Sequence, residues 1–225
     1  MAYCIYRKQI MPIKGVLFDM DGVILDTETL YARFWAEACH ALGYPMTYAQ
    51  ALGMRSLSPK AGQAKLESYF GPGISREAVR NKRVELMDMY VDKHGVEAKP
   101  GVMQLLDYLK EQGIHTAITT SSPLHRVEKY LAPLGLLHRF DKICTGYDVK
   151  CGKPEPDIYL YGAASIGLRP EECLAIEDSP AGIESAYRAG CMAVLVPDLD
   201  GSDEAMRQKL YAEADSLADL IDLLK

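Results

Sequence analysis

The amino-acid sequence predicts an α/β protein, with an open parallel sheet covered by helices and a helical domain inserted into it. Short continuous apolar runs alternate with helical patterns, which is typical of a parallel sheet buried on both faces. One stretch, residues 28–95, interrupts this alternation and contains helical patterns without a convincing buried strand. The chain has 225 residues, which is enough for one substantial core and a modest inserted domain.

The apolar runs that we predict to be buried strands are Gly15–Phe18, His115–Thr119, Lys142–Thr145, Cys173–Glu177 and Met192–Val196. Helical patterns lie between them, such as the apolar stripe that begins at Val102 and that Gly113 is expected to end. Two further helices are predicted to begin at Ser122-Pro123 and Ser179-Pro180, each with a serine N-cap and a proline at the first helical position.

The interrupting stretch predicts a separate helical domain. Its helical patterns are Leu30–Leu42, Lys60–Tyr69 and Arg76–Lys93, and the chain returns at Pro100-Gly101. We predict an N-terminal extension at residues 1–12, a core domain at 13–27 and 96–225, and the inserted domain at 28–95. The alternative is one continuous domain with a helical subregion, which would change the number of domains but not the site.

The composition indicates a globular protein of the cytoplasm. It is 48% hydrophobic and 25% charged, and no apolar run approaches the roughly 20 residues of a membrane helix. Met1–Ile10 lacks the features of a secretory signal. The net charge of -6 opposes binding to nucleic acid or to an anionic membrane. We expect the six scattered cysteines to be reduced, buried thiols, and the chain to be a monomer, with a dimer as the alternative.

Chemically active side chains follow four of the predicted strands, and the carboxyl ends of parallel strands meet at one edge of a sheet. These residues are Asp19 and Asp21, Thr120, Ser121 and Ser122, Lys153, and Glu177 and Asp178. Clustered carboxylates repel one another and cannot all stay ionised without a cation, and Mg²⁺ prefers such oxygen ligands. Hydroxyls at a helix N-terminus can bind phosphate, and a lysine can hold both a phosphate oxygen and a carboxylate. The cluster therefore predicts phosphoryl transfer from a metal-bound phosphate.

The two aspartates at positions i and i+2 can divide the chemistry between them. Asp19 would attack phosphorus and form an aspartyl-phosphate. Asp21 would protonate the leaving oxygen and then take a proton from the hydrolytic water. Alone, each motif also has a structural explanation, such as a solvated turn, a helix cap or an exposed loop lysine. Their order along the chain and their places at strand ends favour the functional interpretation.

In combination, four motifs resemble those of the haloacid dehalogenase superfamily, and more narrowly its β-phosphoglucomutase-like, sugar-phosphatase branch. They are Phe18-Asp19-Met20-Asp21-Gly22-Val23, Thr119-Thr120-Ser121-Ser122, Gly152-Lys153-Pro154-Glu155-Pro156 and Ile176-Glu177-Asp178-Ser179-Pro180-Ala181-Gly182-Ile183. The resemblance runs from Ile13 onward over nearly the whole chain. It implies a Rossmann-like core with an inserted α-helical cap domain.

The resemblance also implies a role for each motif. It makes Asp19 the nucleophile, Asp21 the acid and base, and Thr120, Ser121 and Lys153 the phosphate-binding residues. The expected Mg²⁺ ligands are Asp19, the carbonyl of Asp21, Asp178, and Glu177 directly or through water.

The inserted domain is expected to contact the leaving group of the substrate. Candidate contacts are Thr27 and Glu28 at the hinge, and Arg55 in a loop between helices, which could instead be a solvent-exposed arginine. We expect Arg80, Lys82 and Arg83 to form a solvated helix face, and we assign no role to the five histidines.

The function that we expect is Mg²⁺-dependent hydrolysis of a small phosphorylated metabolite, such as a sugar phosphate. The alternative is a phosphosugar mutase of the β-phosphoglucomutase type, which would return the phosphoryl group to a bisphosphate intermediate. Asp26-Thr27-Glu28 resembles the hinge of phosphatases in this branch, and Tyr31 stands where the mutases tend to carry a histidine. A third alternative, a noncatalytic metabolite-binding protein, would be expected to lack one of the two aspartates, and both are present.

Overall fold

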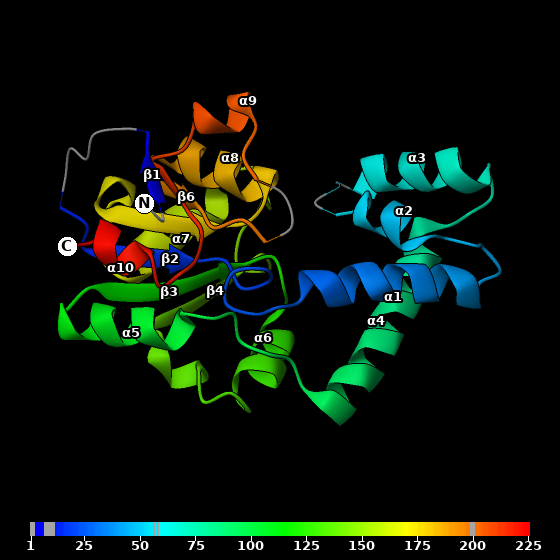
Figure 1. Ribbon diagram of the computed structural model, residues 1–225, viewed down its shortest axis with the longest axis horizontal. Coiled ribbons are helices and arrows are strands. Elements are labelled where there is room, and N and C mark those ends of the chain that lie inside the picture. The colour runs from blue at the N-terminus through cyan, green and yellow to red at the C-terminus, as the bar shows by residue number, and fades with distance from the viewer. Residues whose placement is uncertain (1–2, 7–11, 56, 58, 199–200) are drawn as a thin grey trace. The chain divides into compact units, whose positions relative to one another are not determined.

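The structure is a computed structural model that describes residues 3–6, 12–55, 57, 59–198 and 201–225 (Figure 1). The chain divides into two compact units. The first, here called the core unit, comprises Met1–Asp26 and Glu97–Lys225, and the second, the inserted unit, comprises Thr27–Val96.

The core unit is built on a seven-stranded sheet in the order β1-β7-β6-β5-β2-β3-β4. The strands are β1 Tyr3–Ile5, β2 Gly15–Phe18, β3 His115–Thr120, β4 Lys142–Thr145, β5 Cys173–Glu177, β6 Met192–Leu195 and β7 Ala212–Ala214. All neighbouring strands are parallel except β1 and β7. The predicted fold class, an α/β protein with an open parallel sheet, is therefore confirmed.

Helices cover both faces of this sheet, with α7 and α8 on one side and α5 on the other (Figure 1). The helices of the core unit are α5 Val102–Glu111, α6 Leu124–Leu131, α7 Asp157–Ser165, α8 Pro180–Ala189, α9 Glu204–Arg207 and α10 Leu220–Leu223, with the short 3₁₀ helices Leu137–Arg139 and Pro170–Glu172. Every residue of the inner strand β2 is buried. Burial on both faces explains why this strand is a continuous apolar run in the sequence.

The strands β1 and β7, at one end of the sheet, were not predicted. Both are only three residues long and lack a continuous buried run. Tyr3–Ile5 lies within the segment expected to be an N-terminal extension, and it pairs with β7 in antiparallel orientation. Part of that segment is therefore an edge strand of the sheet.

One of the two predicted helix starts is confirmed and the other is wrong. Ser179 is the N-cap of α8, where its hydroxyl accepts a hydrogen bond from Gly182 N at 3.2 Å, and Pro180 is the first helical residue. In contrast, α6 begins at Leu124 with Pro123 as its N-cap. The hydroxyl of Ser122 donates instead to Asp21 Oδ2 at 2.9 Å, so this serine belongs to the site and not to a helix cap.

The inserted unit consists of α1 Glu28–Ala41, α2 Tyr48–Leu52, α3 Pro59–Phe70 and α4 Arg76–His94, and no strand occurs among its described residues. The short helix α2 was not predicted. The predicted solvated face is wrong for Arg83, whose guanidinium lies 4.6 Å from the ring centroid of Tyr31 and 5.3 Å from that of Trp35. These flat aromatic faces attract the cation and remove it from full solvation.

The cysteine prediction is correct for part of the set. Cys39, Cys144, Cys173 and Cys191 are buried, whereas Cys4 and Cys151 are exposed. Among the described residues, no helix combines the length and the apolar character needed to cross a membrane.

Candidate active site

The site lies at the carboxyl ends of three neighbouring strands, β5, β2 and β3, which are adjacent in the order of the sheet. Phe18, the last residue of β2, pairs with Ile176 on one side and Ile118 on the other. Asp19 continues this register, because its backbone N donates to Ile176 O at 3.0 Å. Three loops that are distant in the sequence therefore begin side by side.

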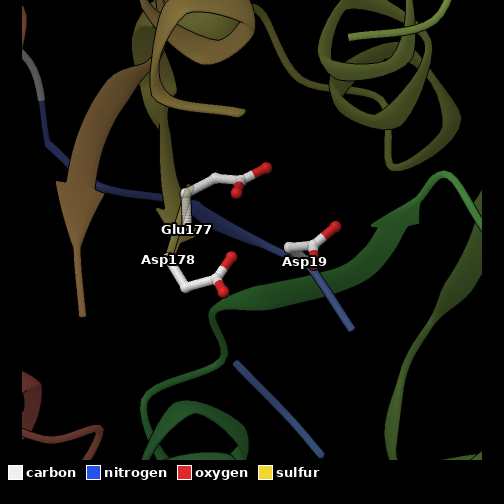
Figure 2. Close-up of side chains that lie close together, drawn as sticks. All are labelled: Asp19, Glu177 and Asp178. Carbon is white, nitrogen blue, oxygen red and sulfur yellow. The ribbon is translucent and has the colours of Figure 1, made fainter. Parts of the chain in front are cut away.

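Three carboxylates gather at this edge. Asp19 follows β2, Glu177 ends β5 and Asp178 follows it, as Figure 2 shows. Each residue offers one carboxylate oxygen, and these atoms lie within 4.8 Å of one another. Asp19 is 8% exposed and Glu177 is fully buried. The sequence-based expectation that these acids share one location agrees with this geometry.

Lys153 joins two of these acids. Its Nζ donates to Asp19 Oδ1 at 2.5 Å, to Glu177 Oε1 at 2.6 Å and to the carbonyl oxygen of Thr119 at 3.0 Å. An ammonium group has three N–H donors, so these three acceptors use all of them. Lys153 is thereby fixed against the carboxylate predicted to be the nucleophile.

The electrostatics of the site favour a bound cation. Burial is the largest cause that raises the pKa of Asp19 to about 8; Lys153 lowers this pKa, and the charges of Glu177 and Asp21 raise it. Burial lowers the pKa of Lys153, but the charges of Asp19 and Glu177 outweigh this effect and raise it. The positive charge of one lysine therefore does not neutralise the negative charge of the acids around it. The carboxylate oxygens of Asp19, Glu177 and Asp178 fit a hard divalent cation such as Mg²⁺.

Glu177 is also engaged by two hydroxyl groups. Tyr159 donates to its Oε1 at 2.5 Å and Ser179 donates to its Oε2 at 3.1 Å. Gly182 leaves room for this carboxylate, because a Cβ at that position would overlap it. Tyr159 was not predicted to belong to the site. Its only signal is that it lies six residues after Lys153, in an apolar helical pattern that resembles ordinary core.

The hydroxyl run after β3 is close to Asp21. Thr120 is buried, and its hydroxyl oxygen accepts a hydrogen bond from Ser122 N at 3.0 Å. Ser122 in turn donates to Asp21 Oδ2, whereas the side chain of Ser121 is exposed. The structure thus brings Asp21 and the predicted phosphate-binding loop together.

The three candidate substrate contacts belong to the inserted unit. Thr27 is the buried N-cap of α1, Glu28 is in the first turn of that helix, and Arg55 follows α2 and donates through Nε to Leu52 O at 3.1 Å. Their role toward a substrate stays a prediction.

Fold and site together define a class of enzyme: a protein with a Rossmann-like parallel sheet, at the end of which an aspartate and a lysine are in contact beside an acidic cluster. Residues 13–190 match the family model of the haloacid dehalogenase-like hydrolases. The chain belongs to this family, and the resemblance found in its sequence is confirmed.

Similar proteins include sugar phosphatases and a phosphomutase. The chain is 34% identical to hexitol phosphatase A of Escherichia coli (strain K12) over 194 residues, covering 83% of this chain and 84% of that protein. It is 33% identical to a phosphorylated carbohydrates phosphatase of Thermotoga maritima over 178 residues, 79% and 82% of the two chains. The crystal structure of β-phosphoglucomutase from Clostridium difficile matches with a TM-score of 0.70 at 25% identity. The match covers 92% of this chain and 93% of that one.

Proposed function

We propose that this enzyme is a Mg²⁺-dependent phosphatase that hydrolyses a small phosphorylated carbohydrate through an aspartyl-phosphate at Asp19. The observation that supports this most strongly is the contact of Lys153 with Asp19 at 2.5 Å, beside the acidic cluster of Glu177 and Asp178. A lysine so placed holds the attacking carboxylate, and its positive charge attracts the phosphate.

In the first step, the carboxylate of Asp19 attacks phosphorus while the bond from phosphorus to the leaving oxygen breaks. Lys153 holds Oδ1 of Asp19, which leaves Oδ2 to form the new bond. Asp21, to which Ser122 donates a hydrogen bond, gives its proton to the leaving oxygen, so that the product departs as an alcohol. Thr120 and Ser121 would hold the phosphate oxygens that do not react.

In the second step, Asp21 takes a proton from a water molecule, which attacks phosphorus and releases phosphate from Asp19. Asp19, Glu177 and Asp178, with the carbonyl of Asp21, would hold the Mg²⁺ ion, which when bound offsets the repulsion between carboxylate and phosphate and stabilises transition-state charge.

The substrate class is proposed from the relatives. Two of them are named for phosphorylated hexitols or carbohydrates, and their identity with this chain extends over most of both sequences. We propose a monophosphate of a sugar or sugar alcohol, with Thr27, Glu28 and Arg55 of the inserted unit as contacts for its hydroxyls. We further propose that the enzyme acts in the cytoplasm as a monomer.

The second candidate is a phosphosugar mutase, which the similarity to β-phosphoglucomutase favours. The same Asp19 chemistry would then return the phosphoryl group to a sugar phosphate instead of to water. Tyr31, at a position where mutases tend to carry a histidine, supports hydrolysis.

One assay series separates the two functions. Phosphate release is measured over a panel of sugar, sugar-alcohol and nucleoside monophosphates, with and without chelation of Mg²⁺. Isomerisation of glucose 1-phosphate, primed with a glucose bisphosphate, is measured in parallel. We expect Mg²⁺-dependent release from a subset of the sugar esters. Isomerisation without phosphate release would instead establish the mutase, and full activity after exhaustive chelation would contradict the metal requirement.

A further inference from the structure

A fully buried tyrosine, Tyr159 on α7, contacts two charged groups of the site. Its hydroxyl donates to Glu177 Oε1 at 2.5 Å, and the Nζ of Lys153 lies 5.2 Å from the centroid of its ring. The hydroxyl thus binds the acid and the ring face attracts the ammonium group. Most buried tyrosines need only one partner for the hydroxyl, whereas this one contacts both members of an ion pair.

The backbone of α7 holds this ring in place. Gly162 lies one turn after Tyr159 on the same helix, and a Cβ added there would lie 2.5 Å from Cγ2 of Thr119 in β3. The glycine therefore lets α7 approach the sheet more closely than any other residue would allow. Tyr159 and Thr119 are both fully buried, so the ring is enclosed beside the strand that supplies a third acceptor to Lys153.

The hydroxyl of Tyr159 determines where Glu177 points. Oε1 of Glu177 accepts from both Tyr159 and Lys153, while Oε2 accepts from Ser179. These donors contact both oxygens of the carboxylate. Oε1, which accepts from Tyr159, is also the oxygen that accepts from Lys153. Lys153 then extends to Asp19. A continuous chain of hydrogen bonds connects Tyr159, Glu177, Lys153 and Asp19.

We propose that Tyr159 is a positioning residue for phosphoryl transfer: it orients Glu177 so that this carboxylate holds Lys153 against the attacking Asp19. This inference rests on the proposed function, because it assumes that Asp19 is the nucleophile. Its consequence is specific. Loss of the hydroxyl should misplace reacting groups and lower kcat, while the sugar part of the substrate binds as before.

The main test is Tyr159→Phe, which removes the hydroxyl and keeps the ring over Lys153. Tyr130→Phe is the matched control, since Tyr130 is also buried, on α6, and belongs to no part of the proposed mechanism. We expect kcat of Tyr159→Phe to fall at least about tenfold, the loss that a hydrogen bond to a charged group can produce. KM should change by less than about threefold. The control should keep its kcat, and a kcat equal to wild type in Tyr159→Phe would overturn the inference.

A double-variant cycle tests whether Tyr159 acts through Glu177. We expect Tyr159→Phe to have little further effect on kcat in a Glu177→Gln background, because residues that act as a unit are not additive. Independent losses, each multiplying the other, would show that Tyr159 does not act through Glu177. If Tyr159→Phe does not fold, Gly162→Ala replaces it, since it pushes α7 away from β3 and leaves the side chains of the site unchanged. A folded Gly162→Ala with wild-type kcat would then overturn the inference.

A binding measurement separates positioning from a merely structural role. Orthovanadate, a mimic of the transferring phosphoryl group, is titrated calorimetrically in the presence of Mg²⁺. We expect the Kd for vanadate to rise at least about fivefold in Tyr159→Phe and to stay unchanged in Tyr130→Phe. A lower Tm with unchanged vanadate affinity would indicate a structural role only. A wild-type enzyme that neither hydrolyses nor isomerises any ester would refute the proposed function, whereas an active wild type with an equally active Tyr159→Phe would refute only this inference.

Discussion

At the scale of single residues, the site is defined by the surroundings of Asp19. Burial, helped by the nearby acids Glu177 and Asp21, raises its pKa to about 8, although the contact with Lys153 lowers it. Ionisation of this carboxyl group costs free energy in the free protein. A bound metal ion would favour the ionised form, which can then attack phosphorus.

Replacing Asp19 by asparagine tests the nucleophile at this scale. Asp19→Asn keeps the size of the side chain but removes the attacking oxygen charge. We expect turnover to fall by more than about 10⁴-fold, while the circular dichroism spectrum stays that of the wild type. An active Asp19→Asn would contradict the assignment.

The acid and base role of Asp21 has a different signature. Asp21→Ala should slow esters with poor leaving groups most, because these need a proton as they depart. The measurement compares kcat for p-nitrophenyl phosphate with kcat for an alkyl phosphate. Equal losses on both substrates would show that Asp21 does not protonate the leaving group.

The sequence could predict which charged residues the structure brings together, because most of them follow strands whose apolar runs are clear. It left Ser122 open between the hydroxyl run of the site and a helix cap, and it did not predict Tyr159 as a member. A serine before a proline is typical of a helix cap, and a tyrosine in an apolar helix is typical of core. Only the bonds from Ser122 to Asp21 and from Tyr159 to Glu177 distinguish them.

At the scale of elements, α8 packs against the site through Gly182. Its first turn passes so close to Glu177 that a Cβ would overlap the carboxylate. We expect Gly182→Ala to lower the free energy of unfolding by about 1–3 kcal/mol, in spite of alanine's better helix propensity, and to reduce kcat. Thermal unfolding and kinetics of the purified variant check both effects.

Gly62 on α3 provides the comparison for this prediction. An added Cβ there would lie 2.5 Å from Nε of Arg76, in the outer part of a long, flexible side chain that can shift more easily than the fully buried Glu177. Gly62→Ala should therefore have a smaller effect on Tm than Gly182→Ala and none on kcat. A larger loss of Tm in Gly62→Ala than in Gly182→Ala would show that close packing at Gly182 does not determine stability.

The elements differ in how well the sequence predicts them. The strands β2 and β5 are buried on both faces, so their apolar runs are unambiguous. The strands β1 and β7, at one end of the sheet, are three residues long and pair with each other in antiparallel orientation, which no local pattern indicates. The helix start at Ser122 failed for a similar reason, because a contact with Asp21 outweighs the local preference.

At the scale of the whole molecule, stability should depend on pH through Glu172. The hydrogen bond from Lys14, at 2.7 Å, is the largest cause that lowers the pKa of Glu172 from 4.5 to about 2. The unfolded chain therefore binds this proton more readily than the folded one. The resulting stabilisation is complete above about pH 4.5 and is lost as the pH falls through about 2.

Glu172→Gln tests this dependence. We expect Tm of the variant to lie below that of the wild type near neutral pH, and the difference to shrink as the pH falls from 4.5 toward 2. Added salt should also reduce it, because Lys14 is half exposed. Glu155→Gln, which alters an exposed pair with Arg188, is the control. A difference in Tm that is constant with pH would contradict the linkage.

The most direct test of the whole account is to trap the covalent intermediate. The enzyme is mixed with Mg²⁺ and an active sugar phosphate, quenched during turnover, and treated with borohydride, which reduces an acyl phosphate to an alcohol. Peptide mass spectrometry should find homoserine in place of aspartate at position 19, and only when both Mg²⁺ and substrate were present. Reduction at another aspartate, or none during active turnover, would contradict nucleophilic attack by Asp19.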